Sequence, residues 1–423
     1  MKITFILVLI LPVLLLLPGT SPAVSLSGES NTYMQSRQAA DGTKELPFYE
    51  YLNLSVRDIG KETISFQFGG WLRYDLKDNT QETGQSRSAN DLSYAYLSYY
   101  SKTANTTVNL GRVMVFEGVA ADRLDGIYAR TDLAKNFGVS AFGGTPVETG
   151  TDSEGSNSIY GARVSHQVPG LYQIGLSYLK QERNSEEVRK EEGIDLWLRP
   201  IDKVELMGKS RYNAITSEWS DHNYVLALGP FYRVRLNTLL SSVNYKDYFT
   251  ASTTAVFKFD PGVIDPNEKV QTLGEQVSYD VNEKLNISAL YKSYSYDITG
   301  DATYYTGSLR YAVGKSWGTG GSIGRMAGDV ERLKYKEYRV YGYGKFGKAD
   351  ATLDYLLVNY DEAINSVRAA FSVTLAAAYE LTEKLKIGAD VEYSKNPDFD
   401  KDVRTFLKLI YNFDFVQGKK GGV

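Results

Sequence analysis

The chain has 423 residues, and its 47 basic and 51 acidic side chains give a formal net charge of −4 at pH 7. A charge this small carries no electrostatic signal for nucleic acid, so we expect no nucleic-acid partner. The chain has no cysteine, which excludes disulfides, thiolate metal sites and covalently attached c-type haem of its own. We expect no cofactor and no bound metal.

The N-terminus has the pattern of a secretory signal peptide. Lys2 supplies a positive charge, an apolar run extends from Ile3 to Leu17, and small residues follow at Ser21 to Ala23. The apolar run is shorter than the roughly 20 residues that a membrane-spanning helix needs. We therefore predict a signal peptide over residues 1–23 and export from the cytoplasm.

The residues after the signal peptide contain no segment apolar enough to span a bilayer as a helix. Only a closed β-barrel could then cross a membrane, and the 33 tyrosines suit the aromatic girdles of such barrels. Residues 24–46 are polar and unpatterned, and we predict a flexible periplasmic leader there. The next segment, Pro47 to Asp58, is compatible with a strand or with a segment tucked into the barrel mouth.

Alternation of apolar and polar residues recurs along the rest of the chain. It is seen from Lys203 to Asn213, from Phe231 to Leu240, from Lys384 to Lys395 and from Val403 to Phe415. Because successive side chains of a strand point to opposite faces, each segment describes a strand with one apolar and one polar face. A soluble sandwich needs a second apolar face that this pattern does not supply. We predict an all-β, antiparallel up-and-down transmembrane barrel with charge in its lumen.

Short turns alternate with longer connections from Thr63 onward. We predict periplasmic turns near 102–105, 134–136, 168–170, 200–203, 229–230, 282–284, 314–316, 347–349 and 382–384. We predict extracellular connections at 77–90, 145–158, 183–192, 216–221, 246–269 and 396–401, and shorter ones near 297–301, 328–331 and 361–364. This gives about 20 strands, with a range of 18 to 22. The barrel is predicted over residues 47–415, with a short tail over residues 416–423.

Charged residues on the polar faces are candidates for the lumen lining. They are Lys209, Arg211, Arg233, Arg235, Asp390, Glu392, Lys408 and Asp414. If the first four form a positive stripe and the acidic residues a negative one elsewhere on the wall, the separation of sign would give a weak selectivity filter. The alternative is that they are solvated wall residues.

The longest connection, residues 246–269, is unusually aromatic for a surface loop, with Tyr248, Phe249, Phe257 and Phe259. A barrel of this size has an interior wider than side chains fill. The connection could fold inward as a constriction, or it could extend the wall outward.

We predict no enzymatic activity. His166 and His222 are the two histidines, and Asp221 beside His222 is the one pair that resembles a general base with its orienting acid. Adjacent strand residues point to opposite faces, so Asp221 cannot readily orient His222.

The last strand carries aromatic residues at two-residue spacing, Tyr411, Phe413 and Phe415. They resemble the C-terminal assembly signal of bacterial outer-membrane proteins, although here seven residues follow Val416. The barrel assembly machinery is therefore an expected partner, together with outer-membrane lipid.

The mature chain resembles the porin-like outer-membrane barrels of metal-reducing deltaproteobacteria. The resemblance rests on LPFYEYLNLSVRDIG, on DYF at Asp247 to Phe249, and on ADVEYSKNPDFDKDVRTFLKLIYNF. It implies a bacterial outer-membrane location. Some members of that group form the barrel of porin-cytochrome conduits, in which multihaem c-type cytochromes occupy the pore.

Two functions are compatible with these observations. The first is a water-filled pore for small solutes, which follows from the residues. The second is a structural sheath around a cytochrome for electron transfer across the outer membrane, which follows only from the resemblance. We expect the pore.

Overall fold

The computed structural model describes residues 25–38, 44–59, 63–77, 86–147, 157–251, 265, 267–314 and 316–416. The predicted signal peptide and residues 417–423 of the predicted tail lie outside these residues. In the part of the chain that is described, no helix combines the length and apolarity needed to cross a bilayer.

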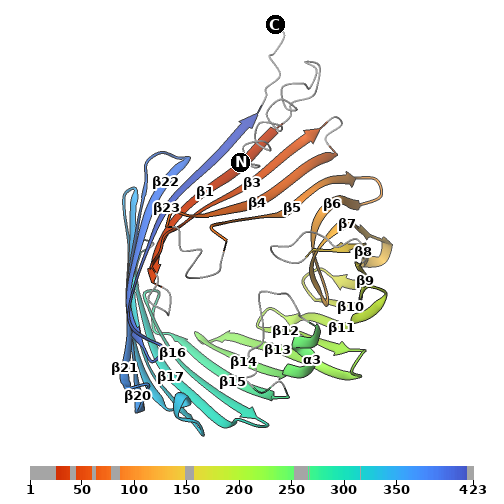
Figure 1. Ribbon diagram of the computed structural model, residues 1–423. Helices are drawn as coiled ribbons and strands as arrows, with labels where there is room; N and C mark the ends of the chain where they lie inside the picture. Colours follow the sequence, from red (N-terminus) through yellow and green to blue (C-terminus); the bar gives the residue numbers. More distant parts are fainter. Residues whose placement is uncertain are drawn as a thin grey trace.

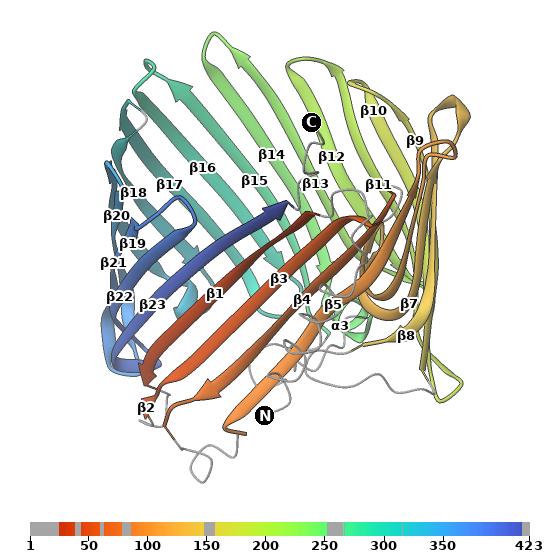
Figure 2. The same ribbon diagram turned by 90° about the horizontal axis from the view of Figure 1, so that it is seen from above.

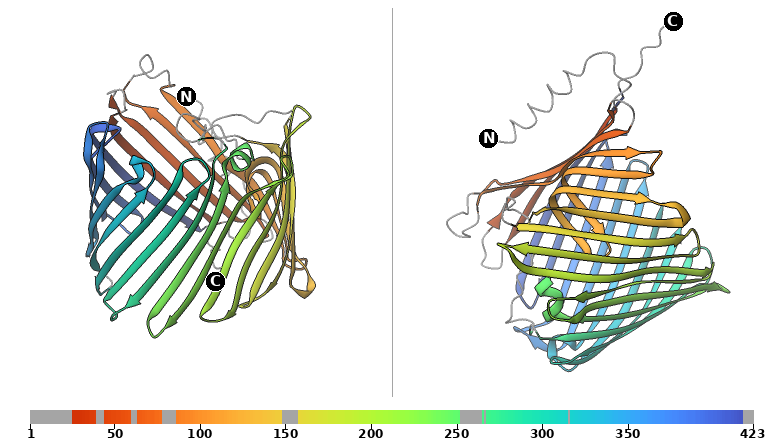
Figure 3. Two further views of the ribbon diagram at one scale, coloured as in Figure 1. Left: turned by 90° about the horizontal axis from the view of Figure 1, so that it is seen from below. Right: turned by 90° about the vertical axis from the view of Figure 1, so that its right-hand side faces the viewer.

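The described chain forms one closed antiparallel barrel, as predicted. Its wall consists of β1 and β3 to β23, which is 22 strands, each paired with its neighbours in sequence. The barrel closes where β23 pairs with β1, from Ser25 opposite Val416 to Ser36 opposite Thr405. Figure 1 shows the strands following one another round the ring, Figure 2 shows β23 beside β1, and Figure 3 shows their tilt.

The first half of the wall, from the N-terminus, has eleven strands. Its strands are β1 (Ser25–Gln38), β3 (Pro47–Ile59), β4 (Ile64–Asp75), β5 (Ser88–Ser101), β6 (Thr106–Glu117), β7 (Ala120–Asp132), β8 (Phe137–Pro146), β9 (Asn157–Val168), β10 (Tyr172–Arg183), β11 (Glu186–Ile201) and β12 (Val204–Asn213). A two-residue strand β2 (Lys44–Glu45) pairs with the end of β1 outside the wall, and the short 3-10 helix η1 (Ala134–Asn136) joins β7 to β8.

The second half has the same meander. Its strands are β13 (Glu218–Phe231), β14 (Val234–Asn244), β15 (Lys269–Asp280), β16 (Leu285–Tyr296), β17 (Gly300–Val313), β18 (Trp317–Gly328), β19 (Tyr335–Phe346), β20 (Ala349–Ile364), β21 (Val367–Glu380), β22 (Leu385–Asn396) and β23 (Phe399–Val416). Helix α3 (Tyr245–Ala251) follows β14, and the 3-10 helix η2 (Glu331–Leu333) precedes β19.

The two ends of the barrel differ. The end that carries α3 and the connections after β1, β4 and β8 is called the loop rim here, and the opposite end, where Ser25 and Val416 lie, is called the turn rim. At the turn rim, residues with left-handed backbone angles form tight turns, as at Tyr232 and Arg233 with φ of 50° and 74°. Glycine and asparagine take such angles at least cost, which explains Asn105 and Gly347 in the same role.

The predicted leader is corrected by the structure. Residues 25–38 of the predicted 24–46 segment form β1, which lies in the wall between β23 and β3. Pro47 to Asp58, which we left open, belongs to β3. Backbone pairing on both sides stabilises β1 although its sequence is polar, because every N–H and C=O of a barrel strand can be satisfied by its neighbours.

Two predicted connections are also corrected. Residues 183–192 were predicted as a loop, but Asn184 and Ser185 make a tight hairpin and the rest belongs to β10 and β11. No turn was predicted between 106 and 133, yet a hairpin joins β6 to β7 through Gly118, whose φ is 62°.

Candidate functional site

The two faces of the wall are separated by chemistry. On the outer face, the apolar side chains of neighbouring strands are exposed by 51 to 65%: Leu309, Ile323, Val340, Leu353 and Leu375. The register places polar and charged residues opposite one another on the inner face, such as Asp195 beside Lys209 and Asp354 beside Tyr341. The inner face of the barrel is therefore the candidate site.

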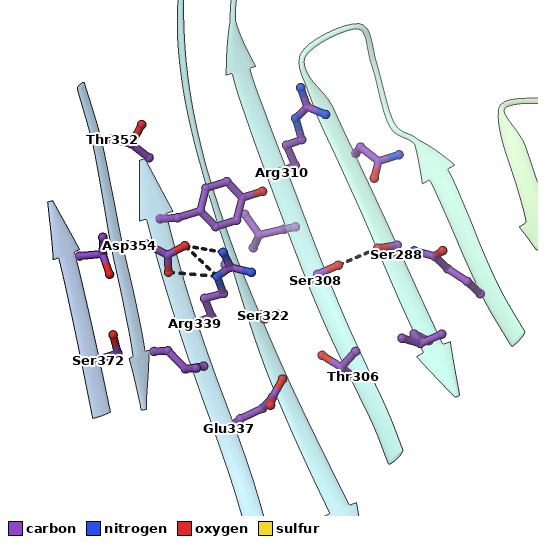
Figure 4. A pocket seen from close by; sticks show the side chains of 18 of the residues that line it. Ser288, Thr306, Ser308, Arg310, Ser322, Glu337, Arg339, Thr352, Asp354 and Ser372 are labelled. Carbon is purple, nitrogen blue, oxygen red and sulfur yellow. Dashed lines mark hydrogen bonds and ion pairs between the residues drawn. The ribbon is translucent and has the colours of Figure 1, made fainter. Parts of the chain in front are cut away.

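A cavity of about 920 Å³ lies against the inner face of β15 to β21. Its lining is rich in hydroxyl groups, and Figure 4 shows them with Arg310 of β17, Glu337 and Arg339 of β19 and Asp354 of β20. Ser288 and Ser308 share a hydrogen bond of 2.6 Å. Such a surface can replace the hydrogen bonds of water to a small polar solute.

The charges in the cavity are paired across strands. Arg339 donates from Nε to Asp354 Oδ1 at 3.0 Å, and Tyr304 donates from its hydroxyl to Glu337 Oε1 at 2.5 Å. Arg310 lies nearer the turn rim and also lines the cavity. The cavity therefore offers hydrogen-bond donors and acceptors, and charges of both signs, to a solute.

Strands β6 to β10 form a second inner feature, which we call the inward lobe. The inner faces of these strands supply a compact apolar core in which several side chains are almost fully buried: Val113, Val115, Val119, Ala120, Leu124, Phe142, Ile159 and Leu179. The β6–β7 hairpin reaches β10, where Val119 N donates to Ser177 Oγ at 3.1 Å. The β6–β7 hairpin of the lobe therefore lies on the inner side of β10, within the barrel interior.

A row of glycines explains the sharp bend of this lobe. Gly111 of β6 lies opposite Gly126 of β7, which lies opposite Gly144 of β8. A Cβ on Gly126 would lie 2.2 Å from Gly143 O, and one on Gly111, where φ is 131°, would lie 2.4 Å from Ala95 O. Glycines in a strand interior mark bends and close backbone approach.

An ionic network fixes the hairpin to the wall. Arg163 donates two hydrogen bonds to Asp195, of 2.9 and 2.6 Å, and lies 3.7 Å from Glu117. Tyr128 and Arg130 also reach Glu117. Because Arg163 and Glu117 side chains are only 7% exposed, losing one partner would leave a buried charge.

A second network continues along β11 to β13. Arg189 bridges Asp122 and Glu191 at 2.7 Å each, and Arg211 lies 3.6 Å from Glu191 and 3.2 Å from Asp221. Glu191 is fully buried. The two networks together attach the β6–β7 hairpin to β9 and β11 of the wall.

Four of the predicted lumen residues lie on β12 and β14 or between β13 and β14. Lys209 and Arg211 are on the inner face, and Arg235 forms an ion pair of 2.8 Å with Asp280. Arg233 is in the β13–β14 turn, three residues beyond the predicted turn, and donates to Val281 O. Its place at the turn rim corrects its assignment to a strand.

The other predicted lumen residues lie on β22 and β23. Asp390 and Lys408 form an ion pair, Glu392 accepts a hydrogen bond of 3.3 Å from Ser372, and Asp414 pairs with Lys384 of the adjacent turn. Because these cations and anions pair between neighbouring strands, the first of the two alternatives, a separation into a positive and a negative stripe, does not fit their arrangement. Sequence spacing within one strand could not identify partners on the next.

The predicted constriction loop is described in part. Helix α3 contacts β11 to β14, Asn213 Nδ2 donates to Asp247 O at 3.2 Å, and the Arg211 guanidinium lies 5.4 Å from the centre of the Tyr248 ring. Tyr248 therefore lies beside Arg211 of the inner face, and Figure 1 shows α3 next to β13 at the loop rim. Phe249 lies in α3, and Phe257 and Phe259 lie outside the described residues.

The two histidines are separated from acidic partners. His222 shares a hydrogen bond of 2.7 Å with Ser210 Oγ on the outer face, whereas Asp221 faces inward to Arg211. His166 contacts the Tyr172 hydroxyl at 3.0 Å. The argument that Asp221 cannot orient His222 is confirmed. In the described residues, no three acidic or histidine side chains gather as a metal site.

The aromatic residues of the last strand have the predicted outward direction. Tyr411 and Phe415 are exposed by 40 and 57%, and the ring of Phe413 lies 5.8 and 6.1 Å from theirs. Gly28 of β1 leaves room for Phe413, because a Cβ there would lie 2.6 Å from the ring. These rings therefore cover the closing seam from outside.

Comparison with known proteins supports the fold. No family model matches the chain, and no curated protein matches it. A ferric enterobactin receptor mutant (PfeA, G324V) of Pseudomonas aeruginosa is 9% identical, with a TM-score of 0.57 over 93% of this chain and 81% of that one. The siderophore receptor PirA of the same organism is 11% identical, with a TM-score of 0.54 over 92% and 80%. The P pilus usher (PapC) translocation pore is 7% identical, with a TM-score of 0.51 over 92% and 99%. At these identities the likeness establishes the barrel fold.

Proposed function

We propose that the protein is an outer-membrane channel that lets small hydrophilic solutes cross. The observation that carries this proposal is the division of the wall, with exposed apolar side chains outside and paired charges and hydroxyl groups inside. A hydrocarbon belt stabilises the first face, and water or a polar solute stabilises the second. Lipid would surround the belt, and assembly machinery would recognise Tyr411, Phe413 and Phe415.

The inward lobe and α3 give this channel its proposed selectivity by size. A barrel of 22 strands would otherwise enclose a space wide enough for a separate plug. The lobe fills part of that space from one side, and the hydroxyl-lined cavity lies on the other wall. A solute would pass between them along the cavity.

Conductance in planar bilayers tests the proposal. We expect the detergent-purified full chain to form open channels in potassium chloride. Asp354→Asn combined with Glu337→Gln should shift the permeability ratio toward anions, because two inner-face carboxylates are removed. Asp202→Asn is the matched control, because its side chain is 96% exposed in a turn. It should leave the ratio unchanged.

Two results would contradict the channel. One is a folded, monomeric chain that stays in buffer without detergent. The other is a purified barrel without conductance that carries haem stain from a bound cytochrome, which would favour the sheath instead.

A further inference from the structure

The wall is incomplete between β5 and β6 toward the loop rim. These strands pair only from Ala95 opposite Arg112 to Ser101 opposite Thr106. Beyond that point Ser88 to Leu92 pair with β4 alone, and Val113 to Glu117 pair with β7 alone. The separation begins at the Gly111 bend, where β6 leaves the wall to enter the inward lobe.

Side chains bridge this opening in place of a backbone ladder. Arg112 and Arg123 each donate from Nη1 to Leu92 O at 3.2 Å, and Arg123 lies 2.5 Å from Asp91. Arg112 also pairs with Asp125. In hydrocarbon, an unpaired strand edge persists only where other groups satisfy it, and these arginines supply donors for the edge of β5.

An apolar track runs along the outer face of β6 beside the opening. Leu110, Met114 and Phe116 share that face and are exposed by 60, 46 and 70%. Arg112, at the alternate position between Leu110 and Met114, lies on the same face and is paired with Asp125. Leu110 precedes the bend and belongs to the outer belt, whereas Met114 and Phe116 follow it on the part of β6 that enters the lobe. Apolar surface therefore lies on both sides of the bend, in the belt and toward the barrel interior, and the Arg112–Asp125 pair separates the two parts in the opening.

We propose that the β5–β6 opening is a lateral portal, through which an apolar molecule passes between the membrane and the barrel interior along Leu110, Met114 and Phe116. The portal goes beyond a channel for hydrophilic solutes, and it rests on the proposed membrane location. Apolar molecules fit because Leu110, Met114 and Phe116 offer exposed carbon surface, whose burial is favourable. The two arginine contacts to β5 form its latch.

The test uses the fluorescent apolar dye N-phenyl-1-naphthylamine and intact Gram-negative cells that make the full chain. We expect the chain to raise the rate of dye entry several-fold over cells without it. Met114→Ser combined with Phe116→Ser should remove most of this increase. Phe346→Ser is the matched control, because Phe346 is 71% exposed on the outer face at the turn rim and should leave entry unchanged.

Asp91→Ala provides a change in the opposite direction. It removes the carboxylate that holds Arg123, so dye entry should rise above that of the natural chain. Conductance in potassium chloride, measured for every variant, keeps the two proposals distinguishable. The portal would be overturned, and the channel left standing, if conductance were unchanged and the chain did not raise the rate of dye entry. The same holds if Phe346→Ser lowered the rate of dye entry as much as the Met114→Ser and Phe116→Ser pair does. Absent conductance would overturn the channel.

Discussion

Single residues at the loop rim hold the ends of strands together. Glu268 is fully buried and accepts hydrogen bonds from the backbone N–H groups of Ile298, Thr299 and Lys269 and from the Thr299 hydroxyl. Burial alone would raise the pKa of Glu268, but these hydrogen bonds outweigh it and hold the pKa below its ordinary value of 4.5. The start of β15 is thereby attached to the β16–β17 turn.

This shift predicts a pH dependence at the loop rim. A carboxyl with a lowered pKa stabilises the folded state above its ordinary pKa, and that stabilisation is lost as pH falls through the lowered value. Hydrogen exchange at Ile298 and Thr299, corrected for the intrinsic rate, should show full protection at neutral pH and less protection in acid. In Glu268→Gln, protection should be low and independent of pH. Equal protection of both chains at neutral pH would contradict the role of the charge.

The glycine row makes a second prediction at this scale. Gly111→Ala should destabilise the barrel by about 1 to 3 kcal/mol, because the new methyl group meets Ala95 O and the residue must keep a left-handed φ. Gly307→Ala is the control, since nothing lies within 4 Å of its Cβ position, and it should change stability by less than about 0.5 kcal/mol. Urea unfolding from lipid vesicles measures both. Equal midpoints would show that the bend tolerates a side chain.

At the scale of elements, the alternation predicted most strands of the wall and missed β1. β1 was not predicted as a strand because Ser30 and Thr32 lie on its outer face, where both hydroxyls donate to Glu50 at 2.6 Å. This polar group interrupts the alternation on which the prediction of strands depended. Its partner lies on β3, which no local pattern in β1 reveals.

The β6–β7 hairpin was missed for another reason. Its tip is apolar, with Val119 and Ala120 buried in the lobe, so it lacks the polar composition that marked the other turns. Gly118 was the one local signal, and a lone glycine in a strand pattern also indicates a bulge. The cavity lining was missed as well, because serine and threonine become a shared surface only when the register brings β16 to β21 together.

The attachment of the inward lobe can be tested through Arg163. Arg163→Met removes the partner of Asp195 and of buried Glu117, and such a loss costs about 3 to 5 kcal/mol. We expect the lobe to loosen and single-channel conductance to rise or to fluctuate between levels. Arg339→Met, in an exposed pair on the opposite wall, is the control and should cost less than about 1 kcal/mol. Steady conductance at the natural level in Arg163→Met would show that the networks do not hold the lobe.

At the scale of the whole molecule, closure depends on the number of strands. In an antiparallel meander, neighbouring strands alternate in direction, so the first and last strands can pair in the same manner only if their number is even. The 22 strands meet this condition with β1 included. Without β1, the end strands β3 and β23 would run parallel. The backbone edges of β3 and β23 that β1 now pairs would then be unpaired in lipid.

Deleting residues 25–38 while residues 1–24 are kept should therefore prevent closure. We expect the deleted chain to lose the difference in gel migration between heated and unheated samples that a closed barrel gives, and to form no channels. Ser30→Ala combined with Thr32→Ala is the control, because it removes the side-chain hydroxyls and keeps the backbone ladder of β1. That variant should close and conduct. A deleted chain that still closes would mean that β3 and β23 pair directly, and the even-strand argument would then fail for this barrel.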